Sequence, residues 1–210
     1  MHWVVLAVRG QKGVEDRLHD FKQAEDRLRS VFTERGIAYP PARLILLGLK
    51  FERRVEVYAG DTQGTPRWVM NYPILAASGG LGPKLREGDR QVPEGVYGVD
   101  SLNPNSRYHA ALRIDYPNVF DRASARPDDR TRLGGDIMIH GGGASVGCLA
   151  MGDPAAEELF VLAARVGVRN VKVVLTPVDV RTKSMPAELA GLHSERYAAV
   201  RAALLELSRP

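Results

Sequence analysis

The sequence predicts an α+β fold that is mainly β, in which helices surround a β-rich core. Segments rich in β-branched and aromatic residues fill the middle of the chain, whereas helical periodicity is confined to its two ends and to Pro154–Val166. The 210 residues, 44% of them hydrophobic, are enough for one ordinary domain. We expect that domain at 42–180, an N-terminal accessory helix in 1–41 and a C-terminal helical extension in 181–210.

The first predicted element is a long helix at Val14–Arg35. Its apolar residues recur at near-helical spacing and charged residues fill the gaps between them. Gly36 is expected to end the helix, and Pro40 and Pro41 prevent its continuation. We expect this helix to pack on the main domain, and an interaction or tethering role is the alternative.

Strand patterns follow this helix and continue as far as His140. Leu44–Leu49, Arg54–Ala59 and Arg67–Ala76 are rich in β-branched, aromatic and leucine residues and are separated by turn residues. The next predicted elements are a turn entering a strand at Val92–Tyr97, a turn at Leu102–Ser106, a strand at Arg107–Tyr116, a long polar loop at Tyr116–Leu133 and a short strand at Asp136–His140.

Helical signals return after residue 150. Asp153 as N-cap and Pro154 as the first helical residue predict a helix that continues to Val166 and ends at Gly167. The final elements are a strand at Val171–Leu175 and a helix at Pro186–Leu207.

Charge and cysteine content exclude several classes of function. The formal net charge is +4 and the pI about 9.3, but no run of Lys and Arg is long enough to predict a nucleic-acid surface. A basic cleft would suit a ligand that carries carboxylates. One cysteine cannot form an internal disulfide, and the five histidines lack the spacing of metal ligands, so we expect neither a bound metal nor a cofactor.

The sequence predicts no membrane-spanning segment, because no apolar run approaches the roughly 20 residues that a membrane helix needs. Trp3–Val8 has six apolar residues with no basic residue before it, and the core of a signal peptide usually has about 7–15. We therefore expect either a cytosolic protein or one whose export signal lies outside the chain shown.

The most informative segment runs from His140 to Cys148 and contains four glycines between the histidine and the only cysteine. A thiol nucleophile needs a base and bare N–H groups that hold the charge developing on the attacked carbonyl. We therefore predict Cys148 as nucleophile, His140 as general base and the N–H groups of Gly147 and Cys148 as an oxyanion hole. The backbone carbonyl of Gly141 is one candidate for orienting His140.

Each part of this segment also has an ordinary structural interpretation. A lone cysteine is usually a small core residue, and a histidine at a strand end usually has only a structural role. A glycine-rich run is often only a loop, and a phosphate cradle is disfavoured because no GxxxxGK[ST] pattern is present. The combination of these parts between a strand and a capped helix is what favours catalysis.

The string from His140-Gly141 through Ser145-Val146-Gly147-Cys148-Leu149-Ala150-Met151 resembles the active-site signature of the YkuD-type L,D-transpeptidases, in particular their YafK-like branch. The resemblance extends over about Arg43–Val180. Supporting matches lie at Ala77–Arg90, Pro93–Tyr97, Asn103–His109 and Tyr116–Ala123.

The resemblance implies a β-sandwich or barrel-like core and cysteine acyl transfer on bacterial peptidoglycan stem peptides. Cys148 would attack the carbonyl of a diaminopimelate-like residue at an L-to-D bond and form a thioester, while His140 moves the proton. An amine or water would then accept the acyl group. The resemblance also implies a periplasmic or cell-envelope location and no cofactor. Implied substrate-binding residues are Ser145, which also orders the loop, and His109, Arg107 and Tyr116.

Two departures from the wider family bear on the reaction. Val146 and Ala150 stand where many YkuD-type enzymes carry histidine and arginine. The spacing between His140 and Cys148 is also shorter than in those enzymes. The YafK-like branch shares both features. Cleavage of a link between peptidoglycan and an envelope-anchored protein is therefore as plausible as cross-link formation. The alternatives are a non-catalytic peptidoglycan-binding or interaction module and an unrelated cysteine hydrolase of cytosolic peptides.

Overall fold

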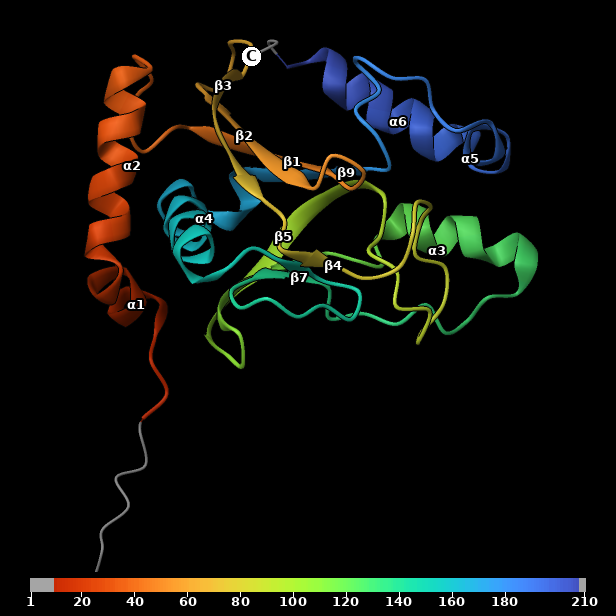
Figure 1. The fold of residues 1–210 in the computed structure, drawn as a ribbon, viewed down its shortest axis with the longest axis horizontal. Helices are drawn as coiled ribbons and strands as arrows, with labels where there is room; N and C mark the ends of the chain where they lie inside the picture. The colour runs from red at the N-terminus through yellow and green to blue at the C-terminus, as the bar shows by residue number, and fades with distance from the viewer. Residues whose placement is uncertain (1–9, 208–210) are drawn as a thin grey trace, which may run out of the picture.

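The computed structural model describes residues 10–207, apart from the side chain of Ala190, so the prediction for Trp3–Val8 lies outside the described residues. Figure 1 shows the arrangement of the elements. The helices are α1 (Val14–Asp20), α2 (Lys22–Glu34), α3 (Val119–Ala125), α4 (Asp153–Val166), α5 (Ala187–Leu192) and α6 (Ser194–Leu205), with short 3₁₀ turns at Arg126–Asp128 and Val168–Asn170. The strands are β1 (Arg43–Leu49), β2 (Arg54–Gly60), β3 (Arg67–Pro73), β4 (Ala76–Ala77), β5 (Gly95–Ser106), β6 (His109–Ile114), β7 (Met138–His140), β8 (Leu149–Ala150) and β9 (Val171–Thr176).

The strands form one mixed sheet in the order β3-β2-β1-β9-β5-β6-β7-β8-β4. Strand β5 has 12 residues and belongs to both halves of the sheet: Gly95–Gly98 pair with β9, and Val99–Ser106 pair with β6. Helix α4 contacts strands of both halves (Figure 1). The α+β, mainly β prediction is therefore confirmed, with one large mixed sheet and α4 packed against strands of both its halves.

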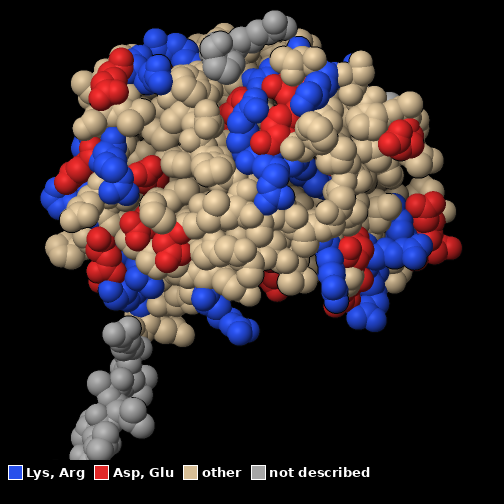
Figure 2. All heavy atoms as spheres, viewed as in Figure 1, with Lys and Arg blue, Asp and Glu red and all other residues tan. Residues whose placement is uncertain are grey.

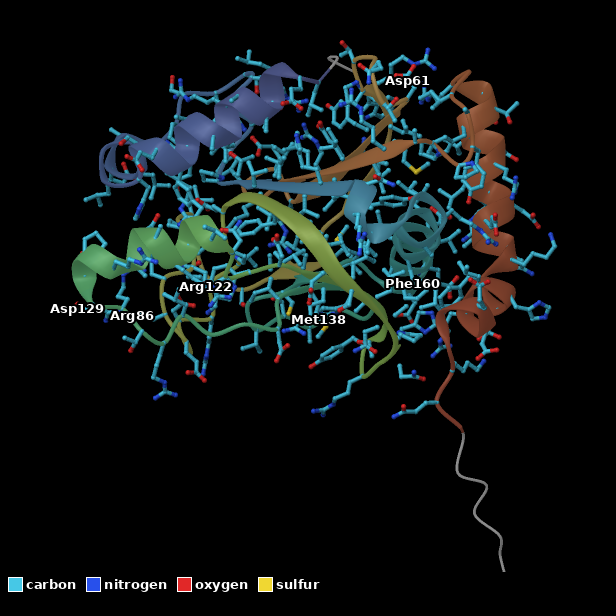
Figure 3. The ribbon with its side chains drawn as sticks, turned by 180° about the vertical axis from the view of Figure 1, so that it is seen from behind. Asp61, Arg86, Arg122, Asp129, Met138 and Phe160 are labelled. Carbon is cyan, nitrogen blue, oxygen red and sulfur yellow. The ribbon has the colours of Figure 1, made fainter. Side chains whose placement is uncertain are left out.

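Helix α2 packs on α4, whereas α1 contacts β5 and α2. Leu28 and Phe32 of α2 are fully buried, and each such side chain contributes about 1.5–3 kcal/mol by leaving water. The predicted single helix at Val14–Arg35 is interrupted at Phe21, whose ring is buried edge-on against Phe160 of α4, labelled in Figure 3. Gly36 adopts a positive φ of 59° just after α2, so the predicted helix end is confirmed.

Two predicted connections are wrong. Leu102–Ser106 is not a turn but the second half of β5, and the chain reverses after Ser106 instead. The turn residues there serve another purpose: Asn105 exchanges hydrogen bonds with the backbone of Lys12, and the Pro104 carbonyl accepts one from Arg17. Pro104 lies where the β5–β6 register shifts, a position in a sheet that tolerates proline.

The polar stretch at Tyr116–Leu133 also differs from its prediction as a loop, because it contains α3. Asn118 caps this helix by accepting a hydrogen bond from the Asp121 N–H, and the Asp121 carboxylate accepts one from the Asn118 N–H. This reciprocal capping box stabilises a helix whose sequence shows little apolar periodicity.

The C-terminal helix is split at His193 into α5 and α6, and α6 covers the β1–β9 half of the sheet (Figure 1). A buried polar cluster joins it to the core. Glu94 accepts hydrogen bonds from Lys50 and Tyr197, and Arg196 forms an ion pair with Asp121 at 2.8 Å. Within residues 10–207, no helix is long and apolar enough to cross a membrane.

Candidate active site

Strands β7 and β8 bring the two predicted catalytic side chains to one face of the sheet. The strands run parallel, with Ile139 opposite Leu149 and His140 opposite Ala150. Cys148 lies two residues before Ala150, so its side chain points to the same face as that of His140. The Cα atoms of His140 and Cys148 are separated by one strand spacing across the sheet and by two residues along the strand, which is about 8 Å in total. The register therefore places both side chains on one face of the sheet, and direct contact between thiol and imidazole stays a prediction.

His140 is held in a defined tautomer. Its Nδ1 lies 2.6 Å from the Gly141 carbonyl, and because a carbonyl oxygen only accepts, Nδ1 carries the hydrogen and the neutral ring keeps a lone pair on Nε2. The ring of Tyr108 stacks on it with centroids 4.7 Å apart, and only 2% of His140 is exposed. Burial lowers the pKa of His140, while the Gly141 carbonyl raises it more weakly. The imidazole is therefore an unprotonated base at neutral pH, oriented by the carbonyl that the sequence had suggested.

Position 141 has room only for glycine. A Cβ there would lie 2.5 Å from an Asp153 carboxylate oxygen and 2.8 Å from the Tyr108 carbonyl oxygen. The same Asp153 oxygen accepts a hydrogen bond from the Gly142 N–H at 2.8 Å. Gly152, not Asp153, is the N-cap of α4, so this carboxylate fixes the glycine-rich loop instead of capping the helix.

The Cys148 thiol is partly buried and protonated at rest. Its S–H donates to the Asp136 carbonyl with 3.7 Å between sulfur and oxygen. Burial raises the pKa of this thiol, a hydrogen bond from the Met138 backbone lowers it, the Asp136 carboxylate raises it and the Lys84 ammonium lowers it. This face of the sheet therefore carries a neutral thiol and a neutral imidazole at neutral pH.

Ser78 and Ser145 hold the loop that carries the nucleophile. Ser145 donates to the Cys148 carbonyl at 2.6 Å and accepts from the Ser78 N–H at 3.1 Å. The Gly147 N–H donates to Ser78 Oγ at 2.6 Å, and Gly147 has a φ of 94° that a residue with a side chain rarely adopts. The predicted oxyanion role of the Gly147 N–H therefore needs correction, because this N–H already donates to Ser78, which follows β4.

The predicted substrate-binding residues are not brought together. Tyr116 is 4% exposed, and its hydroxyl lies 3.3 Å from the Lys84 carbonyl and 3.2 Å from the Leu133 carbonyl, which share its one hydrogen, so it is a core residue and not a substrate-binding one. His109 is bound through Nε2 to Glu157 of α4 at 2.7 Å and packs on the Phe21 ring.

Arg107 is exposed in the turn between β5 and β6, next to Tyr108. Ser145 is used within the loop, as one of its two predicted roles required. The expectation that these four side chains bind substrate is thus corrected for Tyr116 and His109, whose polar atoms bond other parts of the protein.

Sequence reasoning missed four residues of the site: Tyr108 over the imidazole, Ser78 under Gly147, and Asp136 and Lys84 around the sulfur. Three of them lie within or beside the quoted motifs, but their spacing to Cys148 along the chain gave no sign of contact. Between residues 10 and 207, no group of three or more His, Cys, Asp or Glu side chains is placed to hold a metal ion.

Comparison with known proteins shows the family of the chain. The YkuD family, described as the L,D-transpeptidase catalytic domain, matches residues 49–180. YafK of Escherichia coli K12, assigned by name to the L,D-transpeptidases, is 45% identical over 92 residues, which are 43% of this chain and 35% of YafK. The YafK of strain O157:H7 matches to the same extent. The matched region thus spans about a third of these curated relatives.

The solved structure of Pgp2, a helical cell shape determining protein of Campylobacter jejuni, is similar with a TM-score of 0.52 and 26% identity, covering 65% of this chain and 48% of Pgp2. Its K307A mutant, at 22% identity and a TM-score of 0.53, supports the fold alone and covers 78% of this chain and 56% of that one. Because the family match includes β7, β8 and the loop between them and more than half of the sequence, the chain belongs to the YkuD family of L,D-transpeptidase catalytic domains.

Proposed function

We propose that this protein is a cysteine acyl-transferase or amidase that acts on peptidoglycan stem peptides. Cys148 is the nucleophile and His140 is the general base. The observation that carries the proposal is the hydrogen bond from His140 Nδ1 to the Gly141 carbonyl, which leaves the Nε2 lone pair for a thiol on the same sheet face. Membership of the YkuD family supports the substrate class.

In the first half of the reaction, His140 Nε2 takes the Cys148 proton while the sulfur attacks the carbonyl carbon of an L-to-D peptide bond. The Cys148 N–H is the proposed oxyanion donor, since the Gly147 N–H is held by Ser78. Collapse of the tetrahedral intermediate breaks the C–N bond, and the imidazolium returns its proton to the leaving amine. The product is a thioester on Cys148.

In the second half, an amine or water attacks the thioester carbonyl while His140 takes the proton of the attacking group. The C–S bond breaks, the acyl group passes to the acceptor and the sulfur regains its proton from the imidazolium. An amine acceptor gives a cross-link, whereas water releases a free carboxylate. The same steps cleave a bond between a stem peptide and an envelope-anchored protein. We propose a location in the cell envelope, where a peptidoglycan substrate lies.

Intact-mass measurement after incubation with defined muropeptides tests the proposal. We expect a mass increase equal to the acyl group on Cys148, absent in Cys148→Ala and strongly slowed in His140→Gln. His19→Gln, an exposed histidine on α1, is the matched control and should acylate normally. Product analysis then separates transfer from hydrolysis. Unchanged muropeptide turnover in Cys148→Ala would refute the proposal.

The raised pKa of Cys148 favours a second candidate, a non-catalytic peptidoglycan-binding or interaction module with the same fold. This candidate predicts that muropeptides bind without forming a covalent adduct on Cys148. Acylation of Cys148 that is slowed in His140→Gln would count against it and in favour of catalysis.

We further propose that residues 42–180 carry the chemistry, with 1–41 and 181–210 as accessory segments. The family match at 49–180 supports this division. Because α2 and α6 bury side chains against the core, truncation at residue 41 or 181 is expected to lower the melting temperature before it changes the chemistry of Cys148.

A further inference from the structure

Tyr108 covers the His140 imidazole from a short turn between two strands. Strands β5 and β6 pair as far as Ser106 and His109, and the two residues between them form the turn. The Tyr108 ring is stacked on the imidazole at an interplanar angle of 28°, with 4.7 Å between the ring centroids. Because only 2% of His140 is exposed, this ring is part of what keeps water from the proposed base. The position of the turn therefore affects the surroundings of the imidazole.

His109, directly after the turn, has a backbone conformation that is uncommon for any residue except glycine. Its φ is 74°, in the left-handed region that glycine enters without steric cost. A residue with a side chain stays in this region only where the surrounding structure fixes it. The contacts of the His109 side chain therefore show what a histidine contributes at a position where glycine would cause less strain.

Two side chains from other elements hold the His109 ring. Its Nε2 lies 2.7 Å from a Glu157 carboxylate oxygen, and because a carboxylate only accepts, Nε2 carries the hydrogen. The Phe21 ring lies against the His109 ring with 5.3 Å between centroids, and it also packs edge-on against Phe160, labelled in Figure 3. The side chains of His109 and Glu157 are 28% and 25% exposed, so water competes only partly for their hydrogen bond.

Helix α4 supports both segments that flank the catalytic imidazole. Glu157 binds His109, and Asp153, four residues earlier, accepts a hydrogen bond from the Gly142 N–H at 2.8 Å. Side chains four residues apart lie on the same face of a helix. The two segments also contact each other, since a Cβ at Gly142 would lie 3.6 Å from the Tyr108 ring. One face of α4 thus holds the glycine-rich loop and the turn that carries this ring.

Charge around the turn is mixed. Two carboxylates of α4 face it, those of Glu157 and Asp153. Arg17 of α1 adds a positive charge and donates to the Pro104 carbonyl of β5 at 2.6 Å. Acidic and basic side chains are also interspersed over the surface of α1 and α2 in Figure 2. Because charges of both signs are present, their long-range effects largely cancel, and the direct contacts of His109 determine where the turn lies.

We propose that His109 is a positioning residue for the general base His140. Its contacts with Glu157 and with the junction of α1 and α2 fix the turn and so keep the Tyr108 ring over the imidazole. The imidazole then keeps one orientation, with Nδ1 on the Gly141 carbonyl and the Nε2 lone pair free for the proposed proton transfer. This role replaces the substrate binding that the sequence predicted for His109, and it rests on the proposed function of His140.

Nuclear magnetic resonance of His140 tests the inference without a substrate. In the wild type, the ring current of Tyr108 shifts the imidazole C–H signals upfield, and burial lowers the pKa of His140. We expect His109→Ala and Glu157→Ala to reduce the upfield shift and to raise the pKa of His140 toward its ordinary value of about 6.5. His109→Gln, which keeps an N–H donor for Glu157, should restore part of both. Tyr108→Phe should leave both unchanged.

Glu158→Ala is the matched control. Glu158 follows Glu157 on α4, but its carboxylate pairs with Arg27 of α2 at 2.6 Å instead of with the turn. This variant should also lower the melting temperature, while the His140 signals and pKa stay as in the wild type. The inference is overturned if Glu158→Ala changes the His140 pKa as much as Glu157→Ala does. It is also overturned if neither Glu157→Ala nor His109→Ala changes that pKa in a folded protein.

Acylation by a defined muropeptide then relates the turn to the reaction. We expect His109→Ala to lower the maximal rate of Cys148 acylation about tenfold, since misplacement of a reacting group by about 1 Å can cost on the order of 100-fold, and to leave KM unchanged. A higher KM at an unchanged maximal rate would mean that His109 binds substrate, and would overturn the inference.

The two experiments together separate this inference from the proposed function. If Cys148 is acylated at the wild-type rate in His109→Ala, the positioning role is wrong while the proposed function stands. If no muropeptide acylates Cys148 but the His140 signals depend on His109, the proposed function fails while the control of the imidazole by the turn stands.

Discussion

Replacing Gly141 by alanine tests how tightly the glycine-rich loop packs next to His140. The new Cβ would lie 2.5 Å from an Asp153 carboxylate oxygen and 2.8 Å from the Tyr108 carbonyl, both closer than Cβ contacts normally come. The backbone at Tyr108 is fixed in the β5–β6 connection, so Asp153 must move and release the Gly142 N–H. Overpacking costs about 1–3 kcal/mol and loss of a charge-assisted hydrogen bond about 1.5 kcal/mol more.

Together these terms predict a loss of about 3 kcal/mol, which for a domain of this size lowers the melting temperature by about 6–12 °C. The assay is thermal unfolding followed by circular dichroism. Gly143→Ala is the control, because a Cβ at Gly143 meets no atom within 4 Å and its φ is not positive. Equal melting temperatures for the two variants, or a Gly141→Ala protein that melts like the wild type, would refute the packing argument.

Three further predictions concern the nucleophile loop, the thiol and the N-terminal helices. Ser78→Ala removes the acceptor of the Gly147 N–H and should cost about 1–3 kcal/mol in urea unfolding, whereas a stability unchanged from the wild type would mean that water replaces the hydroxyl. Because burial raises the pKa of Cys148, its rate of alkylation by iodoacetamide should continue to increase above pH 8.5, the ordinary thiol value, and a plateau below pH 8 would contradict this. Arg165 lowers the pKa of Glu25 in the folded protein. Their ion pair therefore stabilises the protein at pH values above about 4.3, the pKa of glutamate in the unfolded chain. This stabilisation is lost as the pH falls through the lower pKa that Glu25 has in the folded protein. Glu25→Gln should therefore reduce stability at pH 7 and leave it nearly unchanged at pH 2, and an equal loss at both pH values would exclude this linkage.

Much of the fold was predictable because several strands are buried on both faces, and their sequences are therefore near-continuous apolar runs, which predict buried strands. β1, β2 and β9 are of this kind, and their predicted bounds agree with the structure to within one residue. The errors lie where polar side chains, not apolar periodicity, determine the backbone. The capping box of Asn118 and Asp121 stabilises α3 in a segment whose sequence predicts a loop. Asn105 predicts a turn, but its side chain instead donates a hydrogen bond to the Lys12 carbonyl.

The site was predictable only where its parts are neighbours along the chain. Gly141 is next to His140, so its carbonyl could be named as the orienting group in advance. The acceptor of the Gly147 N–H could not, because Ser78 lies 69 residues away and reaches it through the pairing of β4 with β8. Tyr116 illustrates the opposite error: a motif residue with a hydroxyl reads as a ligand-binding group, but its hydroxyl satisfies two buried carbonyls.

Strand β5 has a consequence for how the protein unfolds. Its first four residues are bonded to one half of the sheet and the remainder to the other, with no loop between them. Neither half can melt alone without tearing this shared strand from its partners, so heat and denaturant should act on a single cooperative unit. The part of the sheet that carries the thiol and the imidazole is therefore stabilised also by the strands of the other half. Amide hydrogens along β5 should exchange with solvent only when the whole molecule unfolds.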